Sequence, residues 1–122
     1  MNGGLTWLNG IMSKNKIYKG KIILESLEDK NLVSKMQILG TEVAGTWTIH
    51  TVLMSKTDIE NLAPYIKQGP WYAHFWHSNE VIAVFRDKIF KFLHNKQRSW
   101  RETIGYGISI GIPMKQLNFP IE

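Results

Sequence analysis

The sequence predicts an α+β domain built on a mainly antiparallel sheet. Strand-like segments follow one another closely between about residues 71 and 94, and capped helical patterns occur at about 56–66 and 100–110. At 122 residues, 43% of them hydrophobic, the chain has the size of one compact domain, which we place at residues 14–122. Residues 1–13 are predicted to be a flexible extension, because Met12 opens MSKNKIYKG in the manner of a natural start.

The first half of the chain holds three predicted strands. KIYKGKIILES, from residue 16, contains an aliphatic run that suits a strand covered on both faces. SKMQILGTEVAG, from residue 34, is predicted to be an irregular or edge strand because glycines interrupt it. TWTIHTVLM, from residue 46, alternates as a half-buried strand does, with one face formed by Trp47, Ile49 and Leu53 and the other by Thr48 and His50.

The first helix is predicted at about residues 56–66. Ser55 and Asp58 have the spacing of a capping pair, and Pro64 should kink or end the helix. Four apolar residues recur on one side of this helix: Ile59, Leu62, Ala63 and Ile66.

Residues 71–94 are predicted to form a three-stranded meander with two-residue loops at Ser78-Asn79 and Asp87-Lys88. One face then carries Tyr72, His74, Trp76, Val81, Ala83, Phe85, Phe90, Phe92 and His94, and the other carries Phe75, Ile82, Val84 and their neighbours. Neither face is polar, so both must be covered. Two short helices offer little cover, and we therefore predict a homodimer.

The last helix is predicted at about residues 100–110. Ser99 and Glu102 have capping-box spacing, the inward stripe is Trp100, Ile104, Gly107 and Ile108, and Gly111 with Pro113 marks the end. The glycines of GYGISIG fall within this helix instead of preceding one, so they are not a phosphate-binding loop. Both main helices are expected on one face of the sheet.

Composition excludes several classes of function. The absence of cysteine removes disulfides, thiolate catalysis and zinc sites built on sulfur. No apolar run is long enough to cross a membrane, and the first residues lack the pattern of a secretory signal, so we predict a cytoplasmic protein without a membrane partner. The net charge of +5 is unevenly placed, because residues 22–83 sum to −3 and residues 84–122 to +4.

The aromatic face of the meander is the predicted binding site. Tyr72, His74, Trp76 and His94 would line a pocket for a small flat ligand, although apolar strands more often simply pack in a core. The same two histidines could instead serve as an acid/base pair with an acid such as Glu42 or Asp58, or as metal ligands with His50 as a third. No motif fixes a reaction, and no cofactor or catalytic residue is assigned.

Nucleic-acid binding is the alternative function. A basic cluster follows the aromatic strands and consists of Lys88, Lys91, Lys96, Arg98 and Arg101. Aromatic sheet faces can stack bases while cations hold phosphates. Neither an RNP-like aromatic motif nor an arginine-rich run accompanies these residues.

Two segments carry a resemblance to a known family. GPWYAHFWHSNEVIAVFRDKIFKF and SWRETIGYGISIGIPMKQLNF, and more loosely KGKIILESLED, are similar to a small prokaryotic family of uncharacterised proteins with a PWY-x-HFW strand and a tryptophan-headed helix ending in GIP. The resemblance implies a compact domain and assigns no activity. The sequence thus predicts a ligand-binding or protein-interaction module, with nucleic-acid binding and a small histidine-dependent enzyme as alternatives.

Overall fold

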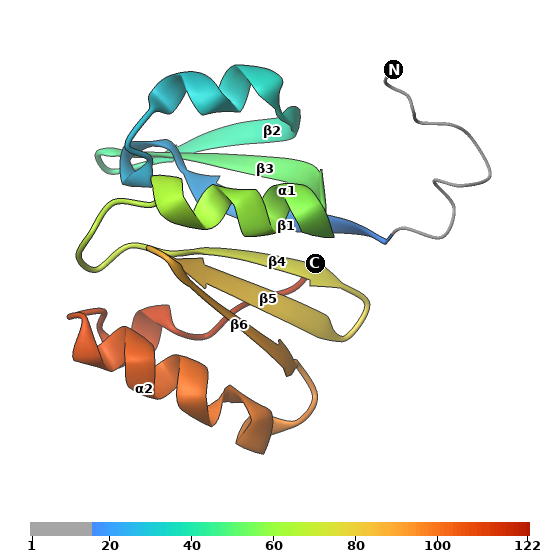
Figure 1. The fold of residues 1–122 in the computed structure, drawn as a ribbon, viewed down its shortest axis with the longest axis vertical. Helices are drawn as coiled ribbons and strands as arrows, with labels where there is room; N and C mark the ends of the chain where they lie inside the picture. Colours follow the sequence, from blue (N-terminus) through green and yellow to red (C-terminus); the bar gives the residue numbers. More distant parts are fainter. Residues whose placement is uncertain (1–15) are drawn as a thin grey trace.

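The computed structural model describes residues 16–122, and it confirms the α+β fold (Figure 1). The predicted flexible extension at residues 1–13 lies outside the described residues. One antiparallel sheet has the strand order β2-β3-β1-β4-β5-β6. Its strands are β1 (Ile17–Ile23), β2 (Gln37–Ala44), β3 (Trp47–Ser55), β4 (Ala73–His77), β5 (Glu80–Phe85) and β6 (Lys88–Leu93).

Two α-helices and several short 3-10 helices accompany the sheet. The α-helices are α1 (Lys56–Leu62) and α2 (Arg101–Ser109), and the 3-10 helices are Leu24–Ser26, Lys30–Lys35, Ala63–Tyr65, Gln97–Trp100 and Met114–Gln116. No helix among residues 16–122 combines the length and the apolar character needed to cross a membrane.

The strands of the first half alternate as predicted, but β3 buries the opposite residues. His50, Val52 and Met54 are buried, whereas the Trp47 face is only half-buried. The reason is tertiary: Val52 and Met54 belong to the core cluster that α1 covers. The strand β1 is likewise buried mainly on the face of Tyr18 and Ile22, not equally on both. The predicted edge strand is β2, where a bulge falls between Ile38 and Gly40 and every residue is exposed.

The first helix begins where the sequence predicts. Ser55 is the N-cap, and its hydroxyl accepts a hydrogen bond from the Asp58 amide at 3.2 Å. The α-helix ends at Leu62, and a 3-10 turn that contains Pro64 continues it to Tyr65. The predicted stripe is buried in full: Ile59, Leu62, Ala63 and Ile66.

The meander forms with the predicted faces and one shifted turn. Trp76 pairs with Val81, as the loop at Ser78-Asn79 requires. In the second hairpin Phe85 pairs with Lys88, so the loop is Arg86-Asp87 instead of Asp87-Lys88. Asp87 takes a left-handed conformation with φ 55°, which aspartate tolerates better than most residues. Relative to the prediction, the residue that pairs with Phe85 moves by two positions, from Phe90 to Lys88. Because side chains alternate with a period of two, each one keeps its predicted face.

The two helices cover opposite faces of the meander, which corrects the expectation that both lie on one face. The first core cluster joins Phe75, Ile82 and Val84 to α1. The second joins Trp76, Val81 and Phe85 to the α2 region and to the C-terminal segment, residues 113–122. After α2 this segment returns to the middle of the sheet and ends near β4 (Figure 1). The chain itself thus covers both apolar faces.

The start of α2 differs from the prediction. Ser99 lies inside a 3-10 turn, and Trp100 occupies the N-cap position without a side-chain cap. The inward side comprises Trp100, Thr103 and Gly107, whereas Ile108 is 48% exposed. The end agrees with the prediction, since Gly111 has φ 97°.

Candidate functional site

Three of the four residues of the predicted binding face lie together beneath the C-terminal segment. The His74 ring lies 5.2 Å from the Trp76 ring and 6.2 Å from the Tyr72 ring. His74 is 6% exposed and Trp76 is 5% exposed. His94 lies just beyond β6, half-buried, with its ring 5.3 Å from that of Trp100.

Phe119 fills the space over this cluster. Its side chain is fully buried, with its ring 5.4 Å from Tyr72 and 6.0 Å from His74. The Tyr72 hydroxyl donates to the Gln116 carbonyl, and His74 Nε2 lies 2.8 Å from the Pro120 carbonyl oxygen. A flat ligand at this position would occupy the space that Phe119 fills. The apolar residues of LNFPI were the signal for this cover, and the sequence prediction did not use them.

Burial also governs the protonation of the cluster. It lowers the pKa of His74, the nearby Lys21 ammonium acts in the same direction, and the bond to Pro120 opposes both. Burial raises the pKa of Tyr72 to about 12. Both side chains are therefore neutral at pH 7, and the Tyr72 hydroxyl and His74 Nε2 are bonded to backbone carbonyls.

The predicted helpers of the two histidines lie elsewhere. His50 is on the opposite face of the sheet from His74, because it pairs with Ile22 whereas His74 pairs with Lys21. Its Nδ1 lies 2.8 Å from the Thr41 hydroxyl. Glu42 faces Lys21 at 3.4 Å, and Asp58 lies on α1, over the other face. Within residues 16–122, no three His, Cys, Asp or Glu side chains are grouped closely enough to hold a metal ion.

The basic cluster is divided between two faces of the meander. Lys91 points towards α1, where it lies 3.5 Å from Glu60, while Lys88 lies on the other face, 5.8 Å from the centre of the Tyr106 ring. Lys96, Arg98 and Arg101 lie close together in sequence where β6 leads into α2, and all three are exposed. The aromatic side chains expected to stack bases are in the second core cluster.

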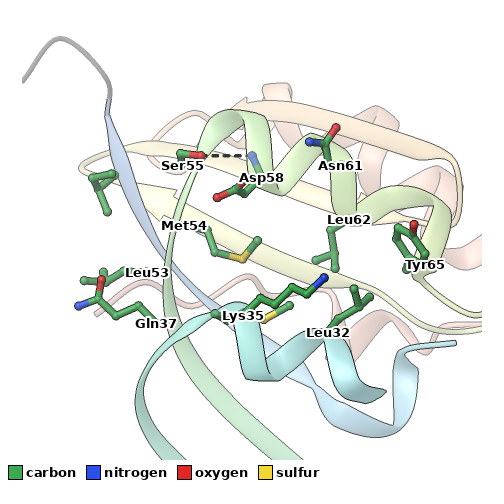
Figure 2. Close-up of a pocket in the computed structure, with 12 residues that line it drawn as sticks. Leu32, Lys35, Gln37, Leu53, Met54, Ser55, Asp58, Asn61, Leu62 and Tyr65 are labelled. Carbon is green, nitrogen blue, oxygen red and sulfur yellow. Dashed lines mark hydrogen bonds between the residues drawn. The ribbon is translucent and has the colours of Figure 1, made fainter. Parts of the chain in front are cut away.

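A groove lies on the α1 side of the sheet, and the sequence prediction missed it. We call it the α1 groove; its volume is about 1010 Å³, and it lies between α1 and the 3-10 helix Lys30–Lys35 (Figure 2). Its apolar lining comes from five elements and includes Ile17, Leu32, Met36, Met54, Leu62 and Tyr65. Figure 2 shows Tyr65 at one end of the groove.

The α1 groove has a buried apolar floor and an exposed rim that includes both apolar and polar residues. Met54 and Leu62 are buried, whereas Tyr65 is 43% exposed and Ile17 is 44% exposed. Figure 2 shows Met54 between the two walls, with Asp58 on the α1 side and Lys35 on the other. The remaining polar rim residues are Gln37, Ser55 and Asn61. Sequence periodicity could not find this site, because it depends on the distance between two helices.

Comparison of the chain with protein-family models, with curated proteins and with solved structures found no match. The resemblance drawn from the PWY-x-HFW strand therefore stays a prediction.

Proposed function

We propose that this protein is a protein-interaction module that binds an amphipathic α-helix of a partner in the α1 groove. The observation that carries the proposal is an open, apolar-floored groove between two helices on one face of a sheet. Helices commonly pack side by side on one face of a sheet. The groove lies between α1 and the 3-10 helix Lys30–Lys35, where a further helix could pack in the same way. Helix-in-groove binding buries the apolar stripe of the partner helix in such a space.

The size of the α1 groove fits a short helix. A helix about 10 Å wide that rises about 1.5 Å per residue has a volume of about 1010 Å³ over roughly nine residues, so the open groove is large enough for the inward side of a helix of that length. This length presents apolar residues at positions i, i+3 or i+4, and i+7, which is the usual set of anchors.

The chemistry of the lining also supports a helical partner. Met36 and Met54 have flexible, polarisable side chains that adapt to a bound apolar surface. Lys35 and Asp58 carry opposite charges on the two walls. The partner helix should therefore present an acidic residue towards Lys35 and a basic residue towards Asp58.

Methionine methyl NMR tests the proposal. A panel of synthetic amphipathic helical peptides is titrated into protein labelled with ¹³C at the methionine methyl groups. We expect saturable shifts of the Met36 and Met54 signals, with Met114 as an internal control, since it is 63% exposed in the turn after α2. Unchanged Met36 and Met54 signals across the panel would contradict the proposal.

A pair of surface variants locates the binding. Tyr65→Lys places a charge at one end of the α1 groove and should weaken peptide affinity about tenfold, or ~1.4 kcal/mol. Ile108→Lys makes a similar change at an equally exposed residue on α2 and should leave affinity unchanged. Equal effects of both variants would place the binding outside the groove.

The predicted homodimer and the cytoplasmic location remain predictions. The homodimer was inferred from the two apolar faces of the meander, and α1, α2 and the C-terminal segment cover these faces. Native mass spectrometry decides between the states: a dimer mass supports the prediction and a monomer mass refutes it.

A further inference from the structure

Three exposed cations fall within six consecutive residues where β6 leads into α2. Lys21 and Lys91 form salt bridges with Glu122 and Glu60. Lys96, Arg98 and Arg101 are exposed, and none forms a salt bridge within residues 16–122. Their charge contributes to the net +4 of residues 84–122. We call these three residues the α2 basic surface.

The backbone that carries the α2 basic surface is held firmly against β6. The Ser99 hydroxyl accepts from the Leu93 amide at 3.0 Å and lies 2.6 Å from the Lys96 carbonyl oxygen. Trp100 is buried, and its Nε1 donates to the Leu93 carbonyl at 3.0 Å. The cations therefore project from an ordered junction, which limits the entropy lost when they bind a ligand.

An exposed glycine, Gly105, follows these cations in α2. Gly105 follows Arg101 by four residues and so lies on the same side of α2. A Cβ on Gly105 would meet nothing within 4 Å, whereas a Cβ on Gly107 would lie 2.8 Å from Leu117. Glycine within a helix costs about 1 kcal/mol relative to alanine. Packing explains Gly107 but leaves Gly105 free for close approach by a partner.

We infer that the α2 basic surface binds the phosphate backbone of a nucleic acid. Arginine presents a planar fork of donors to phosphate oxygens, and an uncovered helix side at Gly105 lets a backbone come close. The aromatic face does not stack bases, because its rings are in the second core cluster. Binding is therefore largely independent of base sequence and depends strongly on salt. This surface is separate from the α1 groove and does not depend on the function proposed for it.

Fluorescence anisotropy with labelled oligonucleotides of mixed sequence tests the inference, using single-stranded DNA, single-stranded RNA and duplex DNA over a range of salt concentrations. We expect binding at low ionic strength, and the logarithm of the binding constant should fall linearly with the logarithm of the salt concentration. Arg98→Gln or Arg101→Gln should each reduce the slope magnitude by about 0.9 on duplex DNA or about 0.7 on single strands. The three probes show which nucleic acid is preferred.

Matched variants distinguish an effect of this surface on binding from an effect of net charge or of misfolding. Lys91→Gln removes one positive charge on the face of the meander that carries α1 and should leave the slope unchanged. Gly105→Leu adds bulk without changing charge; it should weaken binding at least several-fold while the protein remains folded by circular dichroism.

Three results would overturn the inference. They are the absence of binding at low ionic strength, an effect of Lys91→Gln equal to that of Arg98→Gln, and competition by polyglutamate as effective as that by unlabelled oligonucleotide. The last would assign the surface to an acidic protein.

Discussion

His74 connects β4 to the C-terminal segment through its ring. Its Nε2 must carry the proton, because the Pro120 carbonyl can only accept. Protonation would place a positive charge on His74, near the positive charge of Lys21 and close to His94. The carboxylate of Glu122 is the nearby negative group. Burial is the main reason that the pKa of His74 is lowered from 6.5.

This shift makes the stability of the protein sensitive to mild acid. The unfolded chain protonates His74 at a higher pH than the folded protein does, so the free energy of unfolding falls as the pH drops below about 6.5. Well above that pH both states are neutral and His74 adds no pH dependence. His74→Gln keeps a donor and should flatten the slope of stability against pH, by at most ~1.4 kcal/mol per pH unit. Urea unfolding at several pH values measures it; an unchanged slope refutes the prediction.

Gly20 in β1 lies where the Phe75 ring of β4 packs closely against the backbone. A Cβ at this position would lie 2.1 Å from Phe75 Cδ2 and 2.8 Å from the His74 carbonyl oxygen. Gly20→Ala should therefore destabilise the protein by about 1–3 kcal/mol through overpacking. Gly40→Ala in β2 meets nothing within 4 Å and serves as the control, with an expected change below ~1 kcal/mol. Chemical denaturation compares the two, and equal losses would contradict the argument.

At the scale of single elements, α2 contains a natural pair of test positions. Gly105→Ala and Gly107→Ala gain the same helix propensity, about 1 kcal/mol each. Only Gly107 faces Leu117, at 2.8 Å from an added Cβ. We expect Gly105→Ala to raise the melting temperature and Gly107→Ala to lower it, because Leu117 and the C-terminal segment must shift. A higher melting temperature in both variants would show that the C-terminal segment can shift with little loss of stability.

The meander shows how far local patterns determine an element. Alternation assigned residues 71–94 to their two faces correctly, since side chains switch sides at every residue. The second turn was placed one residue too late because Arg86-Asp87 and Asp87-Lys88 are both plausible loops. The loop is Arg86-Asp87 because Asp87 takes the left-handed conformation, with φ 55°, and because the strands pair in that register along the whole hairpin.

For the whole molecule, the sheet order predicts unequal local stability. The strands β1, β3, β4 and β5 have neighbours on both sides, although β3 lies next to the edge. The edge strands are β2 and β6, and every residue of β2 is exposed. Amide hydrogen exchange should be slowest in β1, β4 and β5 and fastest, within the sheet, in β2. Protection of β2 equal to that of the central strands would contradict this order and would indicate a partner along its edge.

The functional surfaces follow from the arrangement of elements more than from any motif. The aromatic and histidine residues were predicted to share a face, and they do, but the C-terminal segment covers that face. The α1 groove arises because α1 and the 3-10 helix Lys30–Lys35, with 20 residues between them in sequence, lie on one side of the sheet. Single-sequence reasoning sees neighbours along the chain and cannot measure that separation.

The sequence by itself determined the α+β class, the strand alternation, the buried stripe of α1 and the exposed cations at the start of α2. These depend on local periodicity, capping and charge, which act over a few residues. The tertiary structure alone decided which face of β3 is buried, which sides of the sheet the helices cover, and that Phe119 closes over His74. These depend on contacts between distant segments, whose free energies no local pattern records.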